Sequence, residues 1–159
     1  MRPGPILAAA LTVLAAACGQ SPEKADGAAA PAPKLTDAEK QAILAAYPAP
    51  YNTADLANGK AKFALCQSCH TVTDGGSNMT GPNLHGVFGQ PAANKAGYKY
   101  SDALKATGFI WDATHLDNWL DKPQTYVPGT KMSFAGVHDP KDRADLIAYL
   151  MVETGYRAQ

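Results

Sequence analysis

The stretch Cys66-Gln67-Ser68-Cys69-His70 is the most informative part of this sequence. Two thiols three positions apart, followed directly by an imidazole, form the attachment pattern of a c-type haem. Each thiol can add to one haem vinyl group to form a thioether, and the histidine then lies beneath the iron as an axial ligand. The pattern predicts covalent haem attachment at Cys66 and Cys69, with His70 as an iron ligand.

Other chemistries also use two cysteines at this spacing, namely half of a zinc site, a redox dithiol or a disulfide hairpin. A four-ligand zinc site would need two more Cys or His ligands. The only other cysteine, Cys18, lies far upstream in the chain. The pentapeptide by itself favours haem but leaves these alternatives open.

The length and composition indicate one modest domain with additional segments, because the chain has 159 residues. Basic and acidic residues balance at 14 each, so the charge gives no indication of nucleic-acid binding. Charged residues make up 18% of the sequence, below the usual fraction of about 25%. The first third, rich in Ala and Pro, accounts for this dilution and differs in composition from a folded domain.

Residues 1–17 predict an export signal, because one Arg precedes a short apolar run that ends in small residues. As a helix, the apolar run would span roughly 20 Å, which is short of a hydrocarbon core of roughly 30 Å. Cys18 follows three alanines in a stretch that resembles a bacterial lipoprotein cleavage box, although Ala15 stands where such boxes prefer Leu. We expect Cys18 to be acylated as the mature N-terminus; an ordinary signal peptide is the alternative.

Residues 18–52 are predicted to be a linker, because most of them are Ala, Pro, Ser and Gly without an apolar period. A short helix is expected near residues 36–47. Thr36 can cap this helix, and Glu39 follows three positions later, as in a capping box. Two prolines then end it.

Residues 53–159 are predicted to form an all-α domain with long loops. A first helix is expected at residues 54–65, and a last helix with an apolar stripe is expected after Pro140. Gly59 lies within the first helix, where a glycine costs about 1 kcal/mol relative to alanine. We therefore expect the last helix to pass close to Gly59.

The segment between these helices is rich in Gly and Pro and contains little apolar material for a core of its own. A large planar apolar cofactor would supply the missing core. Two shorter helices are expected at residues 101–107 and 113–120. The turn that follows ends in Met132, whose thioether can provide a second iron ligand; without the haem motif upstream, a lone Met would be read as core.

These motifs together resemble class I cytochromes c, the group that includes mitochondrial cytochrome c and bacterial cytochromes c2. The resemblance covers residues 53–154 in the family's order, including the haem motif and residues 80–89, 97–103, 126–132 and 145–150. It implies the class I cytochrome c fold, in which the N- and C-terminal helices cross and loops wrap around one covalently attached haem c.

The resemblance also implies roles for individual residues. His70 and Met132 would be the two axial iron ligands, and a Met ligand raises the reduction potential. Pro82 would present its backbone carbonyl to the far nitrogen of His70, which orients the ring. Thr130 would order the loop that carries Met132.

At the other end of the haem, Tyr100 and Trp111 would hydrogen-bond a propionate. Two positions depart from the family pattern. Gln90 stands where an Arg often faces a propionate, and Trp119 stands where a Tyr usually lies near the Met sulfur. Because an indole N–H only donates, hydrogen bonding on the Met side is expected to differ.

Charge is a third departure. From Asn52 onward the chain has ten basic and ten acidic residues, whereas the mitochondrial relatives steer toward acidic partners with a strongly basic face. Any basic patch would therefore be local, formed by Lys60, Lys62, Lys99, Lys122 and Lys131. Tethering to a membrane would reduce the need for steering, because it raises the effective concentration.

The resulting hypothesis is a monomeric, periplasmic electron carrier with one haem c, tethered to a membrane through Cys18. It would be no enzyme and would bind no nucleic acid. The resemblance implies a quinol–cytochrome c oxidoreductase as donor and a terminal oxidase as acceptor. The alternatives are a dedicated electron-accepting subunit of one dehydrogenase and a haem peroxidase, which Met132 disfavours because it would fill the open iron position.

Overall fold

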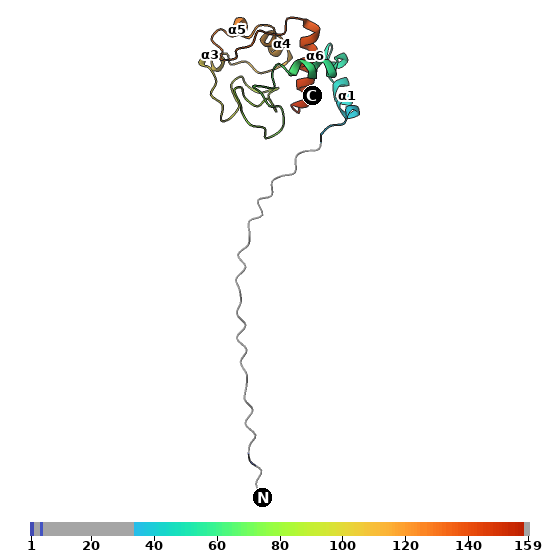
Figure 1. The fold of residues 1–159 in the computed structure, drawn as a ribbon, viewed down its shortest axis with the longest axis vertical. Helices are drawn as coiled ribbons and strands as arrows, with labels where there is room; N and C mark the ends of the chain where they lie inside the picture. The colour runs from blue at the N-terminus through green and yellow to red at the C-terminus, as the bar shows by residue number, and fades with distance from the viewer. Residues whose placement is uncertain (2–3, 5–33, 158–159) are drawn as a thin grey trace. The chain divides into compact units, whose positions relative to one another are not determined.

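The computed structural model describes Met1, Gly4 and residues 34–157, so the expected signal peptide, Cys18 and most of the linker lie outside the described residues. Figure 1 shows the arrangement of the helices. They are α1 (Asp37–Ala45), η1 (Tyr51–Thr53), α2 (Leu56–Phe63), α3 (Asp102–Lys105), α4 (Ala113–Asp121), α5 (Pro123–Tyr126) and α6 (Pro140–Glu153). In this part of the chain the only strand-like pairing is an isolated bridge between Pro91 and Ile110. The all-α prediction is confirmed.

Helices α2 and α6 cross at Gly59, as expected from the sequence. The Asp55 side chain begins α2 by accepting hydrogen bonds of 2.9 and 3.0 Å from the first backbone N–H groups. A Cβ atom at Gly59 would lie 2.7 Å from Cβ of Tyr149 on α6, closer than side chains pack. The two helices therefore meet backbone to backbone. Beside the crossing, the ring centroids of Phe63 and Tyr149 are 5.6 Å apart.

A buried carboxylate supports this crossing. The side chain of Asp145 is 2% exposed and accepts hydrogen bonds from the backbone N–H of Asp55 at 2.9 Å, from Asn58 at 2.8 Å and from Lys141 at 2.7 Å. Burial raises the pKa of Asp145, but these hydrogen bonds outweigh it and hold the pKa below its ordinary value. The carboxylate is therefore an acceptor that joins the start of α2 to α6.

Helix α4 contacts α6 through an apolar face and an ion pair. Leu116, Trp119 and Leu120 are buried on α4. Arg143 of α6 donates to Asp117 at 2.7 Å and to the backbone carbonyl of Val137 at 2.9 Å. Because its side chain is only 11% exposed, this guanidinium holds α4 and the segment before α6 in one position.

Helix α1 packs onto the C-terminal end of α6. Leu44 and Tyr47 are as buried as the core, at 2% and 3% exposure. The Tyr47 hydroxyl donates to the carbonyl of Tyr156 at 3.1 Å, and Lys40 pairs with Glu153 at 2.5 Å. The sequence predicts a linker up to residue 52 with a short helix near residues 36–47, and the structure places that helix, α1, in the same compact unit as α2 and α6.

Replacing Asp145 by Asn is expected to lower the free energy of unfolding of the haem-containing protein by about 2 kcal/mol at pH 7, because hydrogen bonds to a buried charge are weakened. The folded-state pKa of Asp145 lies below its unfolded value of about 3.9. Its contribution is therefore present above that pH and lost as the pH falls through the folded value. Denaturant unfolding at pH 7 and pH 3 measures both effects.

The matched control is Asp74→Asn, which changes a carboxylate whose side chain is 82% exposed. This variant is expected to unfold like the parent at both pH values. Equal losses for the two variants, or a loss at Asp145 that does not become smaller as the pH is lowered from 7, would contradict the assigned role.

Candidate functional site

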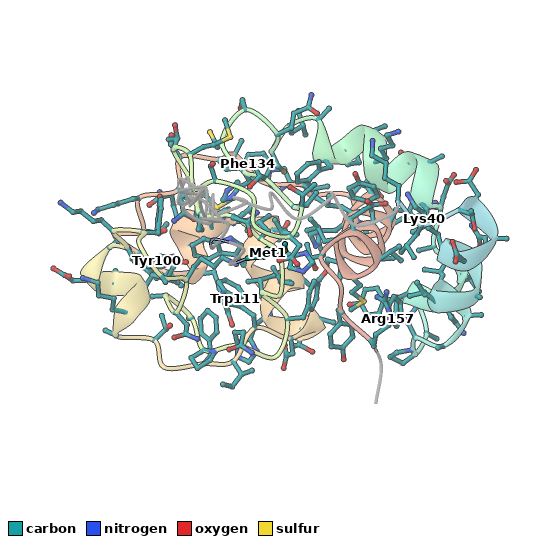
Figure 2. The ribbon with its side chains drawn as sticks, turned by 90° about the horizontal axis from the view of Figure 1, so that it is seen from below. Met1, Lys40, Tyr100, Trp111, Phe134 and Arg157 are labelled. Atoms are coloured by element: carbon teal, nitrogen blue, oxygen red, sulfur yellow. The ribbon has the colours of Figure 1, made fainter. Side chains whose placement is uncertain are left out.

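A cavity of about 550 Å³ lies within the domain, enclosed by α4 and by loops from three parts of the chain. Its wall is mostly apolar, and no Asp or Glu is found among its lining residues. The eight site residues predicted within the described part of the chain all line this one cavity: Cys66, Cys69, His70, Pro82, Tyr100, Trp111, Thr130 and Met132. Figure 2 labels Tyr100, Trp111 and Phe134, which reach the cavity from three separate segments.

The two cysteines follow directly from the end of α2. The N–H of Cys66 donates to Phe63 at 2.8 Å, and the N–H groups of Cys69 and His70 both donate to the Cys66 carbonyl at 2.9 Å. This tight turn brings all three side chains of the motif to the cavity. Neither cysteine forms a disulfide.

Two properties of this turn bear on the alternative chemistries. Burial, together with the neighbouring Cys69, raises the pKa of the Cys66 thiol to about 11, whereas redox dithiols and zinc ligands act as thiolates. Among the described residues no group of three His, Cys, Asp or Glu side chains lies close enough to hold a metal ion. The surroundings therefore fit neither a dithiol nor a four-ligand zinc site.

His70 is oriented by a backbone carbonyl. Its Nδ1 lies 2.7 Å from the carbonyl oxygen of Pro82; because that oxygen can only accept, Nδ1–H is the donor and Nε2 keeps its lone pair. Burial lowers the pKa of His70, although the bond to Pro82 opposes this effect. The imidazole is therefore neutral at pH 7, which is the form that binds a metal.

Two residues that the sequence analysis did not single out hold this carbonyl in place. Gly81 packs flat on the imidazole, since a Cβ there would lie 2.7 Å from both ring nitrogens of His70. Asn83 is 2% exposed, and its side-chain amide donates to Thr71 at 2.6 Å and to the carbonyl of Thr73 at 3.0 Å. Their only sequence signal is their position on either side of Pro82.

Met132 lies on a turn held by side-chain hydrogen bonds. The backbone N–H of Met132 donates to the Thr130 hydroxyl at 3.3 Å. The amide of Gln124 donates to the carbonyls of Thr130 and Met132 at 3.1 and 2.9 Å. Gly129, with φ of +87°, adopts the left-handed conformation that this turn requires. Gln124 is a further supporting residue that the sequence analysis missed.

The cavity wall also contains aromatic and cationic groups. Trp111 is 7% exposed and meets Trp119 edge to face at 5.5 Å. The amide of Asn94 donates to the Gln90 side chain at 3.2 Å. Lys95 and Lys131 are the only Lys or Arg residues among those that line the cavity.

These features form a site for an apolar ligand that brings its own negative charge. Cations without lining carboxylates favour an anionic group on the ligand. Tyr100 and Trp111 offer hydrogen-bond donors. Two thiols, a neutral imidazole and a thioether are the groups that covalent attachment and iron ligation of a haem require. The residues present therefore fit a haem with its two propionates.

Comparisons with known proteins lead to the same result. The family model for cytochrome c matches residues 56–152 of this chain. The chain belongs to the cytochrome c family. Cytochrome c from Kluyveromyces lactis is 42% identical over 105 residues, covering 65% of this chain and 96% of the relative. Cytochrome c2 from Rhodomicrobium vannielii is 41% identical over 105 residues, covering 66% and 84%.

Among solved structures, cytochrome cH from Methylobacterium extorquens superposes with a TM-score of 0.57 at 47% identity, covering 61% of this chain and 97% of that one. As a cytochrome c, this protein binds one covalently attached haem c and is an electron-transfer protein rather than an enzyme. Helix α1 and residues 153–157 lie outside the residues that the family model matches.

Replacing Gly81 by Ala is expected to push the His70 ring out of line, because the new methyl group has no space beside the imidazole. The visible spectrum of the purified holoprotein should then show altered axial ligation, and its free energy of unfolding should fall by at least about 2 kcal/mol. Absorption spectra and denaturant titrations measure the two effects.

Gly108→Ala is the matched control. Gly108 has a left-handed φ of +67°, an added Cβ there meets nothing within 4 Å, and the residue does not line the cavity. This variant should lose only about 1–2 kcal/mol through backbone strain and keep the parent spectrum. Unchanged ligation in the Gly81 variant would contradict the contact with His70.

Proposed function

We propose that this cytochrome is a periplasmic carrier that shuttles one electron at a time from a quinol–cytochrome c oxidoreductase to a terminal oxidase. The observation that carries this proposal is the arrangement of His70 and Met132, which reach one cavity with Cys66 and Cys69. Two protein ligands leave the iron no open position for a substrate. Such a site supports electron transfer better than peroxide chemistry.

In this proposal His70 and Met132 would hold the haem iron, and the surrounding residues fix the positions of both. The haem, when bound, supplies the one-electron Fe(III)/Fe(II) couple. The Pro82 carbonyl fixes the His70 ring at 2.7 Å, and Gln124 fixes both carbonyls of the turn around Met132. Ligands held by hydrogen bonds on both sides change little between oxidation states, which keeps the barrier to electron exchange low.

The remaining proposed roles are hydrogen bonds to a propionate and support of the Met132 turn. Tyr100 and Trp111 would donate to a propionate, and Thr130 would order the Met132 turn, as its 3.3 Å contact with the Met132 N–H supports. Lys95 and Lys131 line the cavity, but their ammonium groups donate to backbone carbonyls, that of Lys95 to His85 and that of Lys131 to Lys99 and Tyr100. At the position of the family's guanidinium the side chain is the neutral Gln90.

We also propose that residues 1–17 are removed on export and that acylated Cys18 holds the protein on a membrane. The support is the leader sequence; within the described residues no helix is long and apolar enough to cross a membrane. Because α1 packs on α6, the segment between Cys18 and the folded domain would end at about residue 34.

Replacing Met132 by Leu, which keeps the side-chain volume, is expected to remove the ferric Met–iron charge-transfer band. It should also lower the reduction potential by more than about 59 mV, a tenfold change in the one-electron equilibrium. Met151→Leu is the matched control, because Met151 is 3% exposed but does not line the cavity. An unchanged band in the Met132 variant would show that another group ligates the iron.

The carrier role and the anchor are tested in one experiment with membranes depleted of their own cytochromes c. Adding the purified full-length holoprotein should restore quinol-driven oxygen uptake at least about tenfold. The parent should sediment with the membranes, whereas Cys18→Ala should stay soluble with the same haem spectrum. Failure to restore uptake would reject the carrier role. A soluble parent protein would reject only the anchor.

A further inference from the structure

Three surface segments beside the cavity contain no charged side chain. They are residues 64–69, 77–82 and 132–136, and none of them includes Lys, Arg, His, Asp or Glu. Each segment contributes to the cavity wall, for example through Leu65, Thr80 and Phe134. We call these three segments the uncharged collar.

The collar lies where the cavity meets the protein surface. Leu65 lines the cavity and is nevertheless 59% exposed, and it immediately precedes Cys66. The backbone N–H of Gly81 donates to the carbonyl of Cys69 at 2.9 Å, and that of Met79 donates to Gly81 at 2.8 Å. Met79, 48% exposed, is thus held next to the attachment motif.

The lysines that flank the collar in sequence do not turn it into a basic patch. Lys62 pairs with Asp142 at 2.6 Å. Lys131 donates to the backbone carbonyls of Lys99 and Tyr100 at 3.3 and 3.4 Å. The sequence analysis counted Lys62 and Lys131 among the members of a possible patch, but the structure directs both ammonium groups to partners within the domain.

We propose that the uncharged collar is the docking surface for a redox partner whose own docking face is apolar and carries few charges. This inference rests on the proposed function as an electron carrier. The reduced protein gives up one electron and the oxidised partner gains it. No bond is formed or broken, and no proton is transferred. A partner must approach a place where the cavity meets the surface for this exchange, and the collar is such a place beside the attachment motif.

The chemistry of the collar favours an apolar partner over a charged one. A charged face placed on the collar would lose water without gaining an ion pair, which is unfavourable. An apolar face would instead bury Leu65 and Met79, and burial of apolar surface is favourable. Encounter without steering proceeds at about 10⁵–10⁶ M⁻¹s⁻¹, and it responds weakly to salt because no charges are screened.

The chain provides a matched control in Ile110. Its side chain is apolar and 46% exposed, similar to Met79. It does not line the cavity, and its backbone forms the isolated bridge with Pro91, outside the three collar segments. A polar substitution there removes the same kind of exposed surface outside the collar.

The test uses the purified, reduced holoprotein carrying Cys18→Ala, so that the encounter is bimolecular, with membranes that retain their terminal oxidase as the oxidant. The second-order rate of oxidation is measured from about 20 to about 300 mM ionic strength. We expect a change of less than about twofold over this range. Leu65→Gln combined with Met79→Gln should lower the rate at least about tenfold, and Ile110→Gln should lower it less than about twofold.

Each other outcome counts against the proposal. A steep fall of the rate with salt would show charge steering, and an equal effect of Ile110→Gln would show that the collar is not the contact. A dimer that sediments as such and dissociates with Leu65→Gln would show that the collar binds a second copy of the chain. Binding to neutral lipid vesicles that depends on the collar would show that it binds a bilayer. Oxidation by a small inorganic iron complex should be equal in all variants, which separates docking from the redox centre.

These readouts also separate the two proposals. If the oxidation rate depends on salt and is unchanged by the substitutions at Leu65 and Met79, only the proposed docking surface is rejected. Membranes that fail to oxidise the protein at any ionic strength, while the inorganic complex still does so, overturn the carrier role and the docking surface together.

Discussion

The close crossing of α2 and α6 is the constraint on which the rest of the structure depends. It exists only because Gly59 leaves no side chain between the two helices, and the buried carboxylate of Asp145 ties the start of α2 to α6. Helix α2 ends at Phe63, and the turn with Cys66 and Cys69 follows at once. The position of the attachment motif is therefore set by a backbone contact well before the motif itself.

Around the cavity, each proposed iron ligand is supported by uncharged hydrogen bonds from the loops. The Pro82 carbonyl holds the imidazole of His70, and the neighbouring Asn83 binds Thr71. Gln124 with Thr130 holds the turn of Met132. These loops contain little apolar material, so a bound haem takes the place of a conventional core. Amides and hydroxyls can order such loops without adding charge beside the iron, which is consistent with a redox site insensitive to local protonation.

Much of this arrangement could be predicted from the sequence, because the attachment motif is local and the other motifs occur in the family's order. All eight described site residues reach one cavity. The supporting residues were not predictable in the same way, since the role of Gln124 depends on which carbonyls happen to lie beside it. The packing of α1 was missed because two prolines follow it and its partner Tyr156 lies 109 residues from Tyr47. The destinations of Lys62 and Lys131 likewise depend on tertiary contacts.

The docking of α1 has a mechanical consequence. A pull on the N-terminal segment reaches α1 first. There Lys40 pairs with Glu153, and Tyr47 donates to the carbonyl of Tyr156 at the C-terminal end of α6. The load is thus taken as shear between α1 and α6 and passes into the longest helix of the described domain. Helix α2, which carries the attachment motif at its end, comes after α1 in the chain and packs on α6. In the proposed tethered form, motion of the membrane relative to a bound partner would therefore strain the α1 contact before it disturbed the cavity.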